Sequence, residues 1–165
     1  PIEMAGTYPL PEAQMDRFLM RISVGYPDHD EEKEIVRSRR SVTETIRLSS
    51  VATIDDILDI QRALPSVRME DVLLDYIVHI VEDTRNAEGV LMGVSPRGSI
   101  ALAQAASARA ILQGRDYVLP EDVKEMAACV LAHRIVLRNR SGAKGTTAQD
   151  VISKILQEER APKVK

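Results

Sequence analysis

The sequence contains very little cysteine and few aromatic residues. It has one cysteine, Cys129, no tryptophan, and 3% aromatic residues in a chain of 165. A single cysteine excludes an internal disulfide, and the apolar helical pattern around Cys129 predicts a buried small hydrophobe rather than a nucleophile. Because aromatic residues are scarce, the core must be built from aliphatic side chains, which favours packed helices over a sandwich of strands.

Other absences narrow the class of protein. No apolar run approaches the roughly 18 residues of a membrane span, and the first residues lack the basic-then-apolar order of a signal peptide. The net charge of -3 provides no overall attraction to nucleic acid or anionic membranes. The three histidines, His29, His79 and His133, are far apart in the sequence, which makes a zinc site improbable. We therefore expect a cytoplasmic protein with no metal site of its own.

Most of the chain has the periodicity and capping signals of α-helices. Acids at the start of 28–40 and arginines at its end match the helix dipole, and Pro65 ends a helix that Thr53 begins. Gly114 suits the position after a helix C-terminus. Helices are expected over 28–40, 53–64, 70–87, 96–113, 120–133 and 147–160. The predicted fold class is mainly α, a helical bundle.

The first 27 residues have a different pattern. A turn-rich loop over 6–11 leads into a short helix from Pro11 to Met15, and alternation over 18–24 predicts one strand. A lone strand leaves its backbone groups unpaired, and the chain begins with Pro1 rather than Met. We therefore expect 1–27 to be the end of a larger α/β domain, followed by a helical domain over 28–160 and a tail over 161–165.

A cation is predicted at the mouth of the helix that starts near residue 96. Ser95 suits the N-cap, Pro96 the first helical position, and Arg97 the first turn, where free backbone donors favour anions. A phosphate would fit there. The alternative is that Arg97 pairs with a carboxylate near the helix start.

Several runs together resemble the MoxR family of AAA+ ATPases over nearly the whole chain. These runs are PIE at 1–3, GTYPLPEAQMDRFLM at 6–20, TR at 84–85, GVSPR at 93–97, GRDYVLPEDV at 114–123 and HR at 133–134. The resemblance implies that 1–27 is the end of the nucleotide-binding core and that 28–160 is the helical lid. One departure is Leu119, where a capping Thr is common, so helix entry there should be weaker by about 1 kcal/mol.

The resemblance also implies roles for two arginines. Arg17 matches the arginine finger, a cation that one subunit supplies to the γ-phosphate of a neighbour's ATP. Arg97 matches the sensor 2 arginine, so Arg97, Ser95 and Pro96 are predicted to bind nucleotide phosphate, in cis or in trans. Glu12 and Asp16 could orient Arg17, or could be a helix-start acid and a solvated carboxylate.

The parts that hydrolyse ATP are missing from this sequence. A P-loop requires a Gly-Lys pair, and none occurs. The Asp30-Glu31 pair does not follow the apolar strand that a Walker B motif requires, and the family's sensor 1 Asn would precede Pro1. We therefore expect the intact protein to use ATP and Mg²⁺, and this chain alone to be inactive and to hold neither tightly.

The resemblance implies a ring-forming chaperone, expected to be a hexamer, that remodels or matures client proteins and works with von Willebrand factor A domain partners. An alternative from another class is a helical binding module that uses no nucleotide, acting as an adaptor or binding nucleic acid. The basic residues near the end of the helical part favour the nucleic-acid version: His133, Arg134, Arg138, Arg140 and Lys144. No aromatic platform accompanies them, so solvated helix-end cations are the simpler explanation.

Overall fold

The computed structural model describes residues 10–40, 48–138 and 145–163. Residues 6–9 of the loop predicted over 6–11, and the last two residues of the tail, lie outside these ranges. The chain divides into two compact units, one made of Pro1–Arg21 with Arg62–Lys165 and the other of Ile22–Gln61. Each unit is described by itself.

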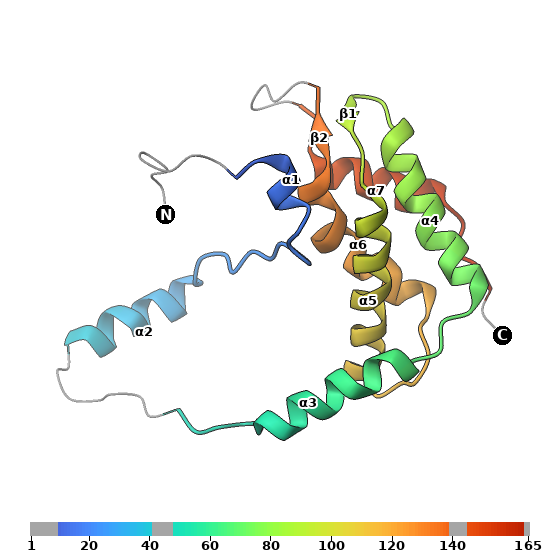
Figure 1. Cartoon of the computed structure of the whole chain (residues 1–165). Coiled ribbons are helices and arrows are strands. Elements are labelled where there is room, and N and C mark those ends of the chain that lie inside the picture. The colour runs from blue at the N-terminus through green and yellow to red at the C-terminus, as the bar shows by residue number, and fades with distance from the viewer. Residues whose placement is uncertain (1–9, 41–47, 139–144, 164–165) are drawn as a thin grey trace. The chain divides into compact units, whose positions relative to one another are not determined.

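The larger unit is a bundle of helices with one small sheet (Figure 1). Its elements in chain order are α1 (Glu12–Met15), the 3₁₀ turn η1 (Leu64–Ser66), α4 (Asp71–Asn86), β1 (Val90–Met92), α5 (Pro96–Leu112), α6 (Pro120–Leu131), the 3₁₀ turn η2 (Ala132–Arg134), β2 (Val136–Leu137) and α7 (Ala148–Glu158).

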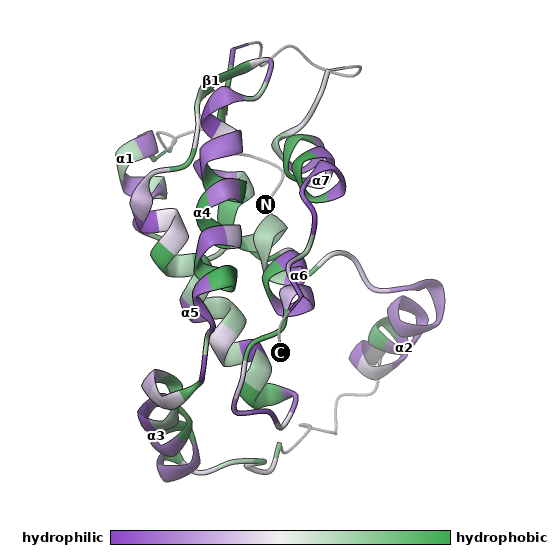
Figure 2. Cartoon of the chain, turned by 90° about the vertical axis from the view of Figure 1, so that its right-hand side faces the viewer, coloured by the Kyte–Doolittle hydropathy of each residue, from purple (hydrophilic) through white to green (hydrophobic). Residues whose placement is uncertain are grey.

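Helix α5 packs against both α4 and α6, and α7 packs on α4 and α6 as well. The buried positions of α5 are mostly alanines, which let the neighbouring helices approach closely, and hydrophilic residues cover much of the outer side of α4 (Figure 2). Aliphatic side chains from the four helices fill the core, as the composition predicts. The largest that are fully buried are Leu73, Ile77, Ile80, Leu102, Leu131 and Ile152.

Two short strands, β1 and β2, form an antiparallel pair that the sequence analysis did not predict. Val90 pairs with Leu137 and Met92 with Val136. The pair joins the loop before α5 to the segment after η2, and the Arg138 backbone N–H donates to the carbonyl of Gly89 at 2.9 Å beside it. The sheet therefore fixes both ends of the α5–α6 hairpin on one side of the bundle.

The smaller unit contains α2 (His29–Arg40) and most of α3 (Ile54–Ala63). Both helices begin with a reciprocal cap. The Asp28 and Glu31 side chains each accept the other residue's backbone N–H, at 2.8 and 3.0 Å, and Thr53 and Asp56 repeat the arrangement. Such caps satisfy backbone donors that have no partner within the helix.

The mainly helical fold is confirmed, and all six long helices form within two residues of their expected ends. The strand predicted over 18–24 is wrong, since these residues form no strand and their large side chains are exposed. The physical reason is the missing partner, because β1 and β2 pair with each other and no other strand occurs in the described residues. Within those residues, no helix combines the length and apolar character needed to cross a membrane.

Candidate functional site

The loop before α5 is held rigidly by α4. The backbone N–H of Val94 donates to the buried hydroxyl of Thr84 at 2.9 Å, and Arg85 Nε donates to the Val94 carbonyl at 2.8 Å. A Cβ at Gly93 would lie 2.6 Å from backbone atoms of Arg85, so a larger residue would displace the loop. The two chain segments that carry Thr84-Arg85 and Gly93-Val94 therefore fix where α5 begins.

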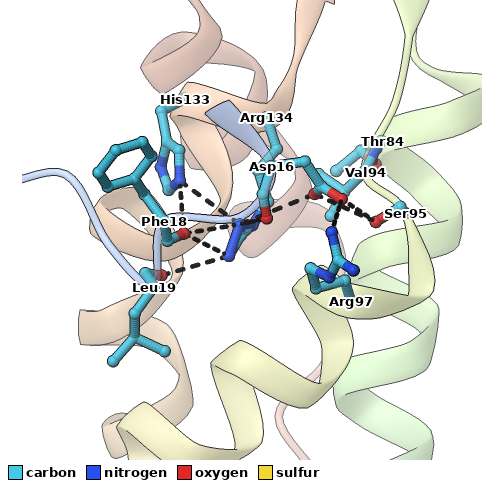
Figure 3. Close-up of polar contacts among 9 residues, drawn as sticks. All are labelled: Asp16, Phe18, Leu19, Thr84, Val94, Ser95, Arg97, His133 and Arg134. Carbon is cyan, nitrogen blue, oxygen red and sulfur yellow. Dashed lines mark hydrogen bonds and ion pairs between the residues drawn. The ribbon is translucent and has the colours of Figure 1, made fainter. Parts of the chain in front are cut away.

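Ser95 occupies the N-cap of α5 and Pro96 its first turn, as predicted, but the Ser95 side chain does not cap the helix. Its hydroxyl lies 3.0 and 3.1 Å from the two carboxylate oxygens of Asp16 and donates to that carboxylate. The first turn of α5 therefore faces an anion from the other end of the chain, the Asp16 carboxylate (Figure 3).

Arg97 lies beside the same carboxylate. Its Nη1 is 3.6 Å from Asp16 Oδ2, and the Arg97 side chain is 59% exposed. The carboxylate pairing that the sequence left open for Arg97 is therefore present, but the ion pair is too long for a hydrogen bond and is open to solvent. Arg97 remains available to a competing anion.

Arg134 is the most buried cation of this cluster, with its side chain 2% exposed. Its two terminal nitrogens donate to three carbonyls of one backbone segment: that of Asp16 at 3.2 Å, that of Phe18 at 3.1 and 2.8 Å, and that of Leu19 at 3.4 Å. Nη1 also lies 3.8 Å from Asp16 Oδ1. The prediction that Arg134 is a solvated helix-end cation is therefore wrong.

His133 contacts the same segment. Its Nε2 lies 3.2 Å from the Phe18 carbonyl, and with Nε2 protonated the ring donates there (Figure 3). Burial lowers the pKa of His133, the nearby charge of Arg134 lowers it further, and the bond to Phe18 opposes the shift. The neutral ring is therefore favoured, and together with Arg134 it fastens the chain on both sides of Arg17.

Arg17 itself points into solvent. It lies in the turn that follows α1, beside a hollow of about 310 Å³ that Gln14 and Phe18 also line. In the described ranges, no side chain or carbonyl pairs with its guanidinium. Asp16, which could have oriented Arg17, instead contacts Ser95, Arg97 and Arg134. The structure thus joins the two predicted site arginines through one carboxylate, which neighbours Arg17 in sequence and Arg97 in space.

A second acidic centre lies at the start of α6 and was not singled out from the sequence. Arg115 donates to both carboxylate oxygens of Asp122 at 2.7 and 2.8 Å, and the Leu119 backbone N–H donates to Asp122 Oδ2 at 2.8 Å. Arg109 Nε lies 3.4 Å from Oδ1. Asp122 thus receives the N–H of Leu119, the position that lacks a capping side chain.

The basic residues after α6 do not form a solvent-facing cluster. Arg134 is buried, and Arg138 Nε donates to the Val90 carbonyl at 3.1 Å. Arg140 and Lys144, which belonged to the same prediction, lie outside the described residues. The described part of this run therefore serves internal contacts.

A family model described as the AAA lid domain matches residues 82–155. The matched region runs from the end of α4 into α7, with Arg97 and Arg134 inside it.

Relatives extend the match to nearly the whole chain. The chain is 41% identical over 162 residues to YeaC of Bacillus subtilis (strain 168), described as uncharacterized, and 40% identical over 173 residues to the chaperone MoxR1 of Mycobacterium tuberculosis. These matches take in 98% and 99% of this chain and 51% and 45% of the relatives. A candidate ATPase from Cytophaga hutchinsonii ATCC 33406 superposes with a TM-score of 0.85 at 36% identity, covering 99% of this chain and 52% of that protein.

The chain belongs to the MoxR family, as the sequence runs predicted. It spans about half the length of the curated relatives it matches. The similarity to the solved structure includes α1 and the segment that carries Arg17, because it covers nearly every residue of this chain.

Proposed function

We propose that this chain is the lid-bearing part of an ATP-hydrolysing AAA+ protein, in which Arg97 senses bound nucleotide and Arg17 is the arginine finger. Bound ATP and Mg²⁺ would be held mainly by parts of the protein outside this chain. The intact protein would assemble as a ring, expected to be a hexamer in the cytoplasm, and would remodel or mature client proteins together with von Willebrand factor A domain partners.

The observation that carries the proposal is the contrast between the side chain and the backbone at Arg17. The guanidinium is exposed and has no partner in the described residues, while the flanking backbone is fastened by a buried arginine. A cation presented to another subunit requires this combination, because a fixed base reduces the entropy lost when the tip engages phosphate. A cation that served only this chain would be expected to pair within it.

The donors around Arg97 suit a phosphate group. Ser95 Oγ and the Arg97 guanidinium, both at the N-terminus of the 17-residue helix α5, contact the Asp16 carboxylate, an anion of similar hydrogen-bonding character. Since the Arg97–Asp16 pair is long and exposed, a phosphate carrying more charge can compete for the same guanidinium.

The test uses the full-length protein with Arg17→Ala. We expect ATP turnover to fall by about 10³-fold or more, because a finger stabilises transition-state charge, while ATP affinity changes less than about twofold. Arg21→Ala is the matched control, since Arg21 is another exposed arginine four positions along the same segment. Turnover in Arg17→Ala close to that of Arg21→Ala would reject the finger.

Mixed rings test whether the finger acts across a subunit boundary. Arg17→Ala subunits are combined with subunits whose P-loop lysine is replaced, each inactive alone. Where an intact nucleotide site meets an intact Arg17 from the neighbour, turnover should return in part. No recovery in rings shown to be mixed would argue against action in trans, and absence of ATP binding by the unmodified protein would favour a nucleotide-independent binding module.

A further inference from the structure

Apart from the Ser95 bond to the Asp16 side chain and the Arg21 N–H bond to the Cys129 carbonyl at 2.9 Å, the backbone that carries Arg17 has few supports besides His133 and Arg134. Helix α1 is four residues long, and the turn after it is closed by the Arg17 and Phe18 N–H groups donating to Gln14 and Met15 carbonyls at 3.1 and 3.2 Å. A helix of this length is marginal by itself in water. Its side chains are largely exposed, so apolar burial contributes little to holding it.

Arg134 holds this segment through hydrogen bonds to its backbone carbonyls. It comes from η2, at the end of α6, where its side chain is buried and Gly98 of α5 leaves it room, since a Cβ there would lie 3.3 Å from Arg134 Cδ. Its planar fork donates to the carbonyls of Asp16, Phe18 and Leu19, one before Arg17 and two after it. Charge-assisted bonds of this kind are roughly twice as strong as neutral ones.

We propose that Arg134 is the positioning residue for Arg17: it fixes the Asp16–Leu19 backbone so that the Arg17 side chain projects in one direction. This inference rests on the proposed role of Arg17 as a finger. Arg134 has no access to a neighbour's nucleotide, because its side chain is 2% exposed, so it acts through the segment that it holds. His133 supplies a third bond to the same place, at the Phe18 carbonyl.

A lysine in place of Arg134 keeps the charge but cannot reproduce the fork. In the full-length protein, Arg134→Lys is expected to lower kcat by about 10- to 100-fold, the usual effect of misplacing a catalytic group by about 1 Å, with KM for ATP nearly unchanged. Hydrogen exchange of the amides over 12–19 should become faster. In the Arg17→Ala background the same change should have no further effect on kcat, since the group being positioned is gone.

Arg115→Lys is the matched control. It also breaks a two-pronged arginine contact, the one to Asp122, but Arg115 lies in the loop between α5 and α6, and its side chain donates to Tyr117 and Asp122 rather than to 10–21. It is expected to lower thermal stability without changing either kcat per folded molecule or exchange over 12–19. A purely structural role for Arg134 would make the two variants alike.

The outcomes separate this inference from the proposed function. Normal turnover in Arg17→Ala rejects the finger itself. If Arg17→Ala is inactive but Arg134→Lys behaves like Arg115→Lys, the finger stands and positioning by Arg134 is overturned. The same holds if the losses of kcat from Arg17→Ala and Arg134→Lys add up in the double variant. Should Arg134→Lys fail to fold, His133→Ala must show the same signature at smaller size, faster exchange over 12–19 with a lower kcat, and its absence overturns the inference equally.

Discussion

Two aspartates in this chain each gather arginines, and they do so in opposite ways. Asp122 is 2% exposed and receives a two-pronged bond from Arg115 at 2.7 and 2.8 Å. Asp16 is 23% exposed, and its arginine contacts are 3.6 and 3.8 Å long. The contacts of Asp122 are short and buried, as expected of an interaction that stabilises the fold. Those of Asp16 with its arginines are longer and partly exposed to solvent.

The difference indicates which cluster can exchange partners. Burial alone would raise the pKa of Asp122, but the Arg115 and Leu119 bonds with the charges of Arg115 and Arg109 outweigh it, and the net effect lowers the pKa. Both oxygens of the Asp122 carboxylate thus accept short hydrogen bonds from within the chain. Around Asp16, by contrast, Arg97 is exposed and can leave one anion for another at small cost.

Neutralising each aspartate tests this contrast directly. Asp122→Asn should lower the free energy of unfolding by about 3 kcal/mol, because it leaves the Arg115 guanidinium, which is 21% exposed, without its counter-charge, while Arg109 keeps its ion pair with Glu125. Asp16→Asn should cost less than about 1 kcal/mol, since its ion pairs are long and partly solvated. Urea unfolding of both variants beside the unmodified chain measures the two losses of stability. Equal losses would show that the contacts of Asp16 with Ser95, Arg97 and Arg134, here called the Asp16 cluster, stabilise the fold as much as those of Asp122.

A smaller loss of stability is expected from crowding the base of the Asp16 cluster. Gly98→Ala places a Cβ 2.1 Å from Val94 Cγ1 and 3.3 Å from Arg134 Cδ, so Val94 must move. Overpacking of this kind costs about 1 to 3 kcal/mol, although Gly to Ala within a helix is otherwise stabilising.

The control for Gly98→Ala is Gly114→Ala. Gly114 has φ +72° with open space around it, so its substitution adds backbone strain of about 1 kcal/mol and no clash. Thermal unfolding of the two variants distinguishes overpacking from strain. A stabilised Gly98→Ala would mean that α5 and Arg134 are not packed as tightly as the structure shows.

The helices could be predicted because their signals are local. Thr147 and Asp150 cap each other at the start of α7, and Gly114 adopts the left-handed conformation after α5, both within a few residues of the helix they delimit. Such pairs need no knowledge of the rest of the fold. The helix bounds were therefore found to within two residues.

The predictions were wrong where the local structure depends on contacts with segments far away in the sequence. Alternation over 18–24 is a strand pattern, but no strand of this chain pairs with it in the described residues, whereas β1 and β2 are too short to give a pattern at all. The partners of Arg134 are backbone carbonyls from the other end of the chain. Because every residue has a backbone carbonyl, no residue type in the sequence marks such a partner. Asp122 could have been found, because an acid at the third position after Leu119 is itself a capping signal.

The smallest expected effect is a pH dependence of the free energy of unfolding. It comes from His133, which lies next to Arg134 and contacts the Phe18 carbonyl. Burial and the charge of Arg134 lower its pKa in the folded chain, so the unfolded chain binds the proton more readily. The stabilisation is therefore fully present above the unfolded pKa of about 6.5 and is lost as the pH falls toward the lower folded value. Asp122 does not interfere, because its lowered pKa places its own titration below that of an ordinary Asp.

Urea unfolding between pH 8 and pH 5 measures this dependence in the unmodified chain and in His133→Gln, which cannot take up the proton. The unmodified chain should lose more stability over that range than the variant, and the difference between the two curves should be smaller than the effect of Gly98→Ala. Parallel curves would mean that the ring is as easily protonated in the folded chain as in the unfolded one. The Phe18 bond, which raises the pKa of His133, would then offset burial and the charge of Arg134, which lower it.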